Sequence, residues 1–175
     1  MNIRDICFIS VFVAMIVALS QLAIPLIGGV PITLQTFIIP LAGTILGAKN
    51  GAIAAFIYIL LGAVGIPVFA GFTGGIGRLT GPTGGFILSY PFMAFAAGYG
   101  ADRGKRLYLA LGLVAGSIIN LSMGMVHFAI FMEVPLYSAF FTTVAPFILL
   151  EAIKMVFVFI LTPKIRRILK TIDFR

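Results

Sequence analysis

Two oppositely charged side chains lie within the last apolar segment of this chain. Glu151 and Lys154 are three residues apart in a stretch that is otherwise largely apolar from Ser138 to Thr162. On a helix this spacing places both side chains on one face, where they can contact each other or a ligand between them. An ionised side chain at the bilayer centre costs about 3 kcal/mol on insertion scales and usually marks a functional site. We favour a ligand-binding role, in which a polar ligand completes the hydrogen bonds of the pair, over a self-neutralised pair that only orients the helix.

Arg78 is the second candidate, because it stands alone in a loop of Gly, Thr, Phe and Leu residues. An arginine there can steer or directly bind an anionic ligand, and the alternative is a solvated loop residue. Glycine permits backbone angles and close ligand approach that other residues do not. We expect the loop to form an ordered cradle rather than a mobile linker, because Pro82 and apolar residues interrupt its glycines, which are Gly71, Gly74, Gly75, Gly77, Gly81, Gly84 and Gly85.

No catalytic arrangement is evident. Ser122 and His127 are five residues apart, so on a helix they project about 140° from each other, and no nucleophile elbow is present. We expect His127 to be a hydrogen-bonded packing residue. A single cysteine, Cys7, excludes a cysteine-based metal cluster, and no glycine run has the spacing of a P-loop. We therefore predict that the chain is not an enzyme and has no catalytic residues, metal site or cofactor.

The elements that must position these residues are predicted to be membrane helices. Apolar residues make up 61% of the chain and charged residues only 10%, with a mean hydropathy of +1.19. Soluble domains are about a quarter charged, so we expect an integral membrane protein. The sequence predicts an all-α fold, with residues 1–175 forming one bundle of six transmembrane helices at Ile6–Ile27, Thr36–Ala48, Gly51–Val68, Gly84–Ala101, Leu107–Phe131 and Ser138–Thr162.

The basic residues predict the orientation of this bundle. Counted over alternate connections, ten Lys and Arg residues fall on one side and only Arg78 on the other. Basic residues concentrate in cytoplasmic loops, so both termini are predicted to be cytoplasmic and the protein to be a multi-pass protein of the cell membrane. Topology explains the net charge of +7, and we expect no nucleic-acid partner.

On the first helix, Ala14 and Ala18 form a small-xxx-small pair that allows another helix to approach closely.

Four motifs together resemble one family. Residues 29–36 (GVPITLQT), 61–69 (LGAVGIPVF), 81–86 (GPTGGF) and 151–154 (EAIK) are similar to the BioY family, the biotin-binding substrate components of energy-coupling factor transporters. The resemblance covers nearly the whole chain. It implies a six-helix protein that captures biotin from outside and delivers it when joined to a transmembrane coupling (T) component and two cytoplasmic ATPase subunits.

The resemblance also implies roles for individual residues. The loop from Gly28 to Gln35 closes over the pocket, and Ala14 and Ala18 match the contact with the coupling component. Glu151 stands where the family usually has Asp, and Lys154 matches its Lys. Thr73 falls where some members have Asn, and Ile87 falls where some have Arg. Arg78 is a candidate to supply the positive charge that is missing at Ile87. The expected substrate site is Gln35, Thr73, Arg78, Gly84, Gly85, Glu151 and Lys154.

The residues alone predict a membrane protein that binds a small, partly apolar anion, and the resemblance sharpens this to biotin. Its apolar body suits a Phe-rich cavity, its ureido group can donate to Glu151, and its carboxylate can pair with either Lys154 or Arg78. The alternatives are a different small, partly apolar anion, an intramembrane enzyme, or a scaffold subunit.

Overall fold

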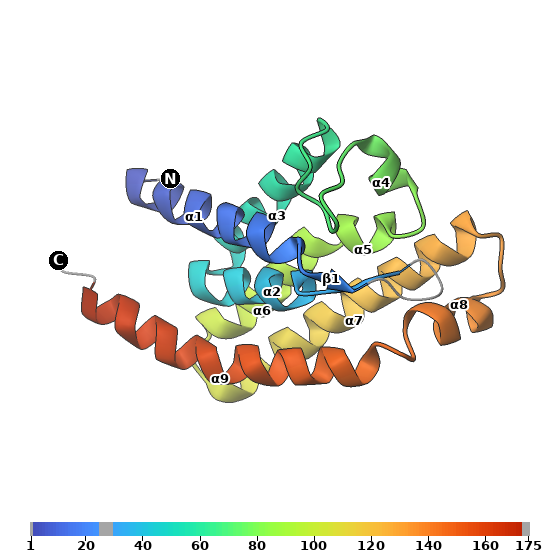
Figure 1. The fold of residues 1–175 in the computed structure, drawn as a ribbon. Helices are drawn as coiled ribbons and strands as arrows, with labels where there is room; N and C mark the ends of the chain where they lie inside the picture. Colours follow the sequence, from blue (N-terminus) through green and yellow to red (C-terminus); the bar gives the residue numbers. More distant parts are fainter. Residues whose placement is uncertain (1, 25–29, 173–175) are drawn as a thin grey trace.

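The computed structural model describes residues 2–24 and 30–172, which form a bundle of helices with one short β-hairpin (Figure 1). The hairpin pairs its two strands antiparallel, with Ala23 opposite Thr33. The expected all-α class holds for the described residues apart from this hairpin. In chain order the elements are α1 (Ile3–Ser20), β1 (Ala23–Ile24), β2 (Ile32–Thr33), α2 (Gln35–Leu46), α3 (Ala48–Ala63), α4 (Ile76–Thr80), α5 (Gly84–Leu88), α6 (Tyr90–Asp102), α7 (Arg106–Phe131), α8 (Leu136–Thr143) and α9 (Ile148–Ile172).

The first helix is shorter than the sequence predicts. We expect it to reach Ile27, but α1 ends at Ser20 and the chain continues into strand β1 at Ala23. Pro25 gives a physical reason, because a proline donates no backbone N–H and disfavours helical backbone in the residue before it. Residues 25–27, where the expected helix ends, lie outside the described residues.

Two further predicted helices are divided near prolines. The expected helix Gly84–Ala101 is split into α5 and α6 at Ser89, and Pro91 lies in the first turn of α6. The expected helix Ser138–Thr162 is split into α8 and α9, which meet at an angle of 55°, and Pro146 lies in the turn between them. Proline lacks the N–H that would bond to the carbonyl four residues earlier, so a helix ends or bends there.

Several helices have the length and composition of membrane spans. Among the described residues, α1 and α7 are long and apolar enough to cross a membrane, and α8 with α9 makes a third if the bent pair is one span. The apolar helices α2 and α3 are shorter, as the sequence predicts, and are separated by Gly47, whose φ is 86°. A bilayer core about 30 Å thick needs about 20 helical residues, so short helices must be tilted or shielded by protein.

The core lies between five helices. Each of α1, α2, α3, α6 and α9 contributes a fully buried side chain, which are Ile16, Ile38, Tyr58, Met93 and Val158. Glycines let the central helices approach until their backbones touch. A Cβ on Gly43 of α2 would lie 2.1 Å from the Ala94 carbonyl oxygen of α6, and one on Gly112 of α7 would lie 2.6 Å from the Ala96 carbonyl oxygen.

The glycine-rich segment between α3 and α5 is ordered, as the sequence predicts. Phe69 and Thr73 form a β-bridge, and the Gly75 N–H donates to the Gly62 carbonyl at 2.7 Å. Gln21, just beyond α1, joins this segment to the first helix. Its amide donates to the Val68 carbonyl at 3.1 Å and its side-chain oxygen accepts from the Phe72 N–H at 2.8 Å.

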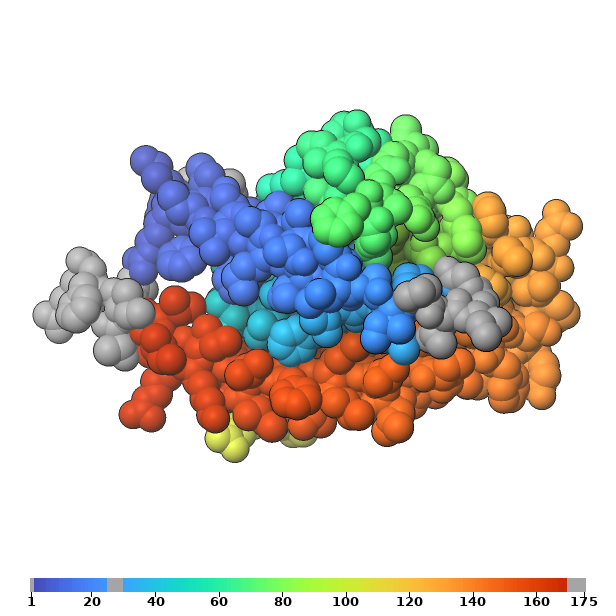
Figure 2. Space-filling model, viewed as in Figure 1, coloured from blue at the N-terminus to red at the C-terminus, as the bar shows by residue number. Residues whose placement is uncertain are grey.

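The start of α1 and the end of α9 lie at the same end of the molecule, on the left of Figures 1 and 2. Basic residues of the sequence gather in the helix ends and turns of this region. Arg166 of α9 reaches α6 at this end, where its Nη2 lies 2.7 Å from Asp102 Oδ1, and Asp102 Oδ2 accepts from the Ala48 N–H at 3.0 Å. We call this the basic end, defined by Arg4, Lys49, Arg103, Lys105, Arg106, Lys164, Arg166 and Arg167.

Candidate functional site

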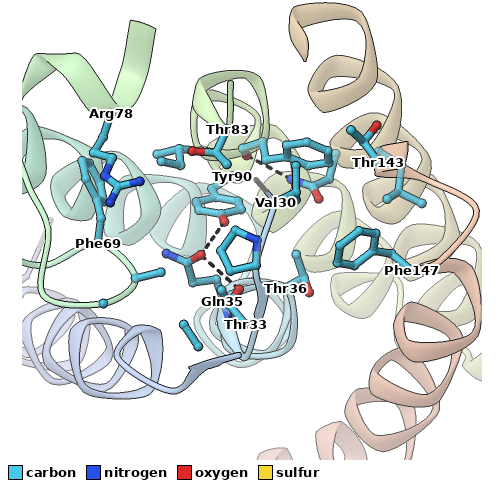
Figure 3. A pocket seen from close by; sticks show the side chains of 18 of the residues that line it. Val30, Thr33, Gln35, Thr36, Phe69, Arg78, Thr83, Tyr90, Thr143 and Phe147 are labelled. Atoms are coloured by element: carbon cyan, nitrogen blue, oxygen red, sulfur yellow. Dashed lines mark hydrogen bonds between the residues drawn. The ribbon is translucent and has the colours of Figure 1, made fainter. Parts of the chain in front are cut away.

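A cavity of about 380 Å³ lies at the opposite end of the bundle from the basic end. Figure 3 shows side chains from the hairpin, the glycine-rich segment and several helices converging on it. Its size and its apolar lining with a few polar groups are typical of small-molecule sites. The lining residues include Val30, Thr33, Gln35, Thr36, Phe69, Thr73, Arg78, Thr83, Phe86, Ile87, Tyr90, Asn120, Thr143, Phe147, Glu151 and Lys154.

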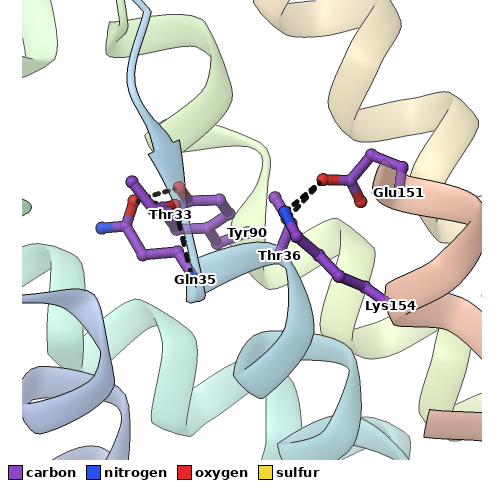
Figure 4. A network of polar contacts seen from close by, with 6 residues as sticks. All are labelled: Thr33, Gln35, Thr36, Tyr90, Glu151 and Lys154. Carbon is purple, nitrogen blue, oxygen red and sulfur yellow. Dashed lines mark hydrogen bonds and ion pairs between the residues drawn. The ribbon is translucent and has the colours of Figure 1, made fainter. Parts of the chain in front are cut away.

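The charged pair on α9 lies in the wall of this cavity. Lys154 Nζ is 3.0 Å from Glu151 Oε1, so the two side chains contact each other directly, which is one of the two arrangements that their spacing permits. Thr36, at the start of α2, joins the pair: its hydroxyl donates to Glu151 Oε1 and accepts from Lys154 Nζ at 2.8 Å (Figure 4). All three residues are buried, with Glu151 6% and Lys154 9% exposed.

The pair is not in the middle of a continuous helix, contrary to the sequence prediction. Because a turn interrupts the helix between Thr143 and Ile148, Glu151 lies in the first turn of α9. The N-terminus of a helix carries partial positive charge from its N–H groups, and this stabilises a carboxylate in the first turn. The break that shortens the helix therefore helps to hold a buried negative charge at the cavity.

One carboxylate oxygen of Glu151 is left without a partner. Oε1 accepts from both Thr36 and Lys154, whereas Oε2 is buried and has no hydrogen-bond partner among the described residues. A buried acceptor without a donor is costly. The terminal torsion of a glutamate is soft, so a small rotation turns this oxygen toward a donor in the cavity. The site is thus suited to a ligand that supplies N–H or O–H groups.

Gln35 forms a second polar network beside the pair. Its Nε2 donates to the Tyr58 hydroxyl at 2.6 Å. Its Oε1 accepts from the Tyr90 hydroxyl at 3.0 Å and from Thr33 Oγ1 at 3.1 Å, as Figure 4 shows. These bonds connect strand β2 and helices α2, α3 and α6. Gln35 lines the cavity, and its contacts fix the position of the hairpin relative to the helices.

Asn120 is a cavity residue that the sequence analysis missed. It lies on α7, is 1% exposed, and donates its amide hydrogens to the Phe86 carbonyl at 3.0 Å and to Ser89 Oγ at 2.6 Å. A ligand can therefore use its side-chain oxygen as an acceptor. The available signal was an amide side chain in an otherwise apolar membrane helix, where polar groups need a partner.

Arg78 and Thr73 both line the cavity from the glycine-rich segment. Arg78 lies on α4, is exposed, and forms no salt bridge among the described residues. Figure 3 shows its guanidinium beside Phe69, across the cavity from Thr143 and Phe147. The Thr73 hydroxyl donates to the Ala70 carbonyl at 3.0 Å.

Gly84 and Gly85 lie behind the cavity and are not among its lining residues. They let α5 pack closely on two neighbours: a Cβ on Gly84 would lie 1.8 Å from the Leu79 carbonyl oxygen of α4, and one on Gly85 would lie 2.3 Å from His127 Cβ of α7. His127 Nε2 lies 2.9 Å from the Gly81 carbonyl oxygen, which confirms its expected role as a hydrogen-bonded packing residue.

Ala14 and Ala18 lie on the exposed face of α1 and do not contribute to the cavity. The opposite face of the same helix holds the buried residues Ile9, Val13 and Ile16. The small-residue pair is thus available to another helix.

Comparison with known proteins identifies the family. A sequence profile of the BioY family matches residues 1–171. The chain belongs to the BioY family. It is 42% identical to the probable biotin transporter BioY of Pyrococcus horikoshii, over 88% of this chain and 91% of that one. It is 35% identical to the biotin transporter BioY of Thermotoga maritima, over 94% of this chain and 97% of that one.

A solved structure also matches. The fold is similar to the crystal structure of the S-component for biotin from an ECF-type ABC transporter, with a TM-score of 0.87, 26% sequence identity, and coverage of 94% of this chain and 92% of that one. Members of the BioY family in these comparisons are transporters, so the intramembrane-enzyme alternative is set aside.

Proposed function

We propose that this chain is the membrane-embedded substrate-binding component of a biotin uptake transporter. The observation that carries the proposal is the unpartnered Glu151 Oε2 in the wall of the cavity, in a chain of the BioY family. Biotin has a ureido ring with two N–H donors, which is the chemistry that a buried carboxylate oxygen requires. The relatives named as biotin transporters support the same ligand.

The two ends of biotin fit different parts of the cavity. Glu151 accepts from the ureido N–H groups, and Lys154, already bonded to Glu151 and Thr36, is placed to donate to the ureido oxygen. Phe86, Tyr90 and Phe147 provide apolar surface for the ring and the chain. Arg78, which has no acidic partner among the described residues, then takes the carboxylate at the other side of the cavity. Of the two cations, we therefore assign the carboxylate to Arg78.

The proposed topology is a single domain of residues 1–175 that crosses the cell membrane six times. Both termini of this multi-pass protein are then in the cytoplasm. Counting α5 with α6 and α8 with α9 as broken crossings gives six. The clustering of basic residues at the basic end supports this orientation, because such residues concentrate on the cytoplasmic side. Arg78 and the cavity then face outward.

The proposed partners are a transmembrane coupling (T) component and two cytoplasmic ATPase subunits. The likeness to an S-component of an ECF-type ABC transporter supports such an assembly. Ala14 and Ala18 are the proposed contact on this chain, since their exposed positions allow a partner helix to approach closely.

Isothermal titration of the purified protein in detergent tests the ligand. Biotin is expected to bind with a stoichiometry of one. Biotin amide, which keeps the ureido ring but lacks the negative charge, is expected to bind about ten-fold or more weakly, because a charge-assisted bond contributes about 1.5–3 kcal/mol.

Two other results discriminate the alternatives. Octanoate offers a carboxylate and an apolar chain without a ureido group, so binding of octanoate as tight as that of biotin would favour another partly apolar anion as the substrate. No binding of any of these compounds to folded protein would refute the proposed function and favour a scaffold subunit.

A further inference from the structure

A second cavity, at the basic end, has no role in the function proposed above. It has a volume of about 460 Å³ and lies between the α6–α7 turn and α9. Four of its lining residues are cations and none is acidic, so it concentrates positive charge in a concave site. The lining residues are Ala101, Gly104, Lys105, Arg106, Leu109, Thr162, Pro163, Arg166 and Arg167.

Arg166 forms the fixed part of this cavity. Its Nε donates to the Thr44 carbonyl and its Nη1 donates to the Ala101 carbonyl at 2.8 Å, while Nη2 pairs with Asp102. These bonds hold one guanidinium between α2, α6 and α9. Asp102 offsets the charge of Arg166, whereas Lys105 and Arg106 form no salt bridge among the described residues, so an excess of positive charge remains around the cavity.

Lys105 and Arg106 form its outer wall. Both are exposed, and neither forms a salt bridge within the described part of the chain. Lys105 is also the N-cap of α7, a helix of 26 residues, and no side chain caps that helix. The unbonded N–H groups of the first turn therefore add to the attraction for an anion that the cations create.

The cavity adjoins apolar surface that faces away from the protein. Leu107, the residue after Arg106, is 67% exposed. On α9, Val156 and Ile160 are 56% and 47% exposed, and they precede Pro163 by seven and three residues. Helical periodicity places these side chains on the same face as Pro163, so the exposed apolar stripe runs directly into the basic cavity.

We propose that this cavity binds the phosphate headgroup of an anionic phospholipid, whose acyl chains lie along α9. Basic pockets between membrane helices are suited to such headgroups, and the adjoining apolar stripe is suited to the chains. A soluble phosphate compound would use the cations but not the stripe. An acidic protein surface is the less favoured occupant, because it is not expected to insert beside exposed residues of the membrane-facing stripe.

Native mass spectrometry of the full chain in non-ionic detergent tests the proposal with phosphatidylglycerol as the probe. We expect one molecule to be retained, in preference to phosphatidylcholine. The double variant Lys105→Gln, Arg106→Gln should bind phosphatidylglycerol about 25-fold more weakly, because each basic residue near an anionic headgroup changes affinity about five-fold. The matched control is Lys49→Gln, Lys164→Gln, which removes the same charge from exposed residues of the basic end outside the cavity.

Three results would overturn the proposal. Equal losses in the two double variants would show attraction by net charge alone. Competition by glycerol 3-phosphate at the same concentration as phosphatidylglycerol would show a site for soluble phosphate compounds. Unchanged phosphatidylglycerol binding in the folded cavity variant, with its thermal unfolding midpoint retained, would leave an acidic protein surface as the alternative occupant.

Discussion

Glu151 combines burial, charge and an unused oxygen in a way that a purely structural residue would not. A self-neutralised pair was the structural alternative to ligand binding, and Lys154 indeed contacts Glu151 at 3.0 Å. Yet the pair uses only one carboxylate oxygen, and the other has no partner among the described residues. Replacing a buried ion pair by apolar residues of similar volume is often neutral or stabilising, by up to about 4 kcal/mol, so stability alone does not explain why the chain has both charges. Ligand recognition is the purpose that fits the cavity.

The first prediction concerns the substitution Glu151→Gln. We expect biotin to bind about 10–100-fold more weakly, because a neutral amide oxygen replaces the charged acceptor of the ureido group, a difference of about 1.5–3 kcal/mol. Some loss of stability is also expected, since Lys154 loses its countercharge. Isothermal titration measures the affinity and a thermal unfolding curve measures the stability.

Glu133→Gln is the matched control, because Glu133 is exposed and does not line the cavity. It makes the same chemical change and is expected to bind biotin as the unmodified protein does. An unchanged affinity in folded Glu151→Gln protein would argue against a direct contact between this carboxylate and the ligand.

The second prediction concerns Arg78→Gln and separates two roles of the cation. If Arg78 holds the carboxylate, as we propose, dissociation of biotin should be about ten-fold faster, with a smaller change in association. If it only steers the ligand, association should be slower and the difference should disappear at high salt. The chain has no Trp, so stopped-flow tyrosine fluorescence can follow binding, because Tyr90 borders the cavity.

Arg103→Gln, at the basic end, is the control for this experiment. Rate constants of Arg78→Gln that match those of the unmodified protein at both salt concentrations would make Arg78 a solvated loop residue. Lys154 would then be the remaining candidate for the carboxylate.

Single residues were predictable from the sequence where the signal was local. The contact of Glu151 with Lys154 follows from their spacing on one helix. Thr36 was not predictable as a partner, because it is 115 positions from Glu151 and only the packing of α2 on α9 brings the two together. The same reason hides the bond of Gln35 with Tyr58, which joins two different helices.

At the level of elements, hydropathy predicted where the apolar segments are but not where they break. Apolar composition is the same in a continuous helix and in two helices joined by a turn, so the division at Ser89 and the turn between α8 and α9 gave no hydropathy signal. Pro91 and Pro146 were the available signals. The β-hairpin was hidden in the same way, because strands β1 and β2 are only two residues each.

The third prediction tests the close packing of α2 on α6. A Cβ on Gly43 would lie 2.1 Å from the Ala94 carbonyl oxygen, which is backbone and cannot rotate away. Gly43→Ala must therefore separate the two helices, and overpacking of this kind costs about 1–3 kcal/mol. We expect a lower thermal unfolding midpoint.

Gly77→Ala makes the same change in α4, where a Cβ would have nothing within 4 Å. It should leave the midpoint nearly unchanged. A Gly43→Ala protein as stable as this control would mean that α2 and α6 are not packed as closely as described.

At the level of the whole molecule, the two faces of α1 have different roles: one packs in the core and the other is available to a partner helix. One face holds the core residues Ile9, Val13 and Ile16, and the other exposes Ala14 and Ala18. The cavity lies away from this exposed pair, and no lining residue belongs to α1. Assembly with partners and capture of the ligand can therefore be disturbed independently.

The fourth prediction is that Ala14→Trp, Ala18→Trp abolishes assembly and spares ligand binding. Two indoles on the exposed face of α1 prevent the close approach of a partner helix. We expect at least about ten-fold less T component to co-purify, which corresponds to about 1.4 kcal/mol, and an unchanged affinity for biotin.

Val114→Trp, Ile118→Trp is the matched control, since it adds two indoles with the same spacing to an exposed apolar face of α7. Co-purification of the α1 variant at the yield of this control would show that the partner contacts a different surface.

The charged pair on α9 also has a consequence for how the protein is made. Thr36 is synthesised long before Glu151, so the growing chain carries part of the cavity without the Glu151–Lys154 pair until α9 is made. Glu151 and Lys154, by contrast, are three residues apart and leave the ribosome together. Their opposite charges can neutralise each other before any other helix is beside them, which lowers the cost of insertion into lipid. The two buried charges of the cavity on α9 thus enter the membrane already paired with each other. The binding site is complete only when α9 packs against the other helices.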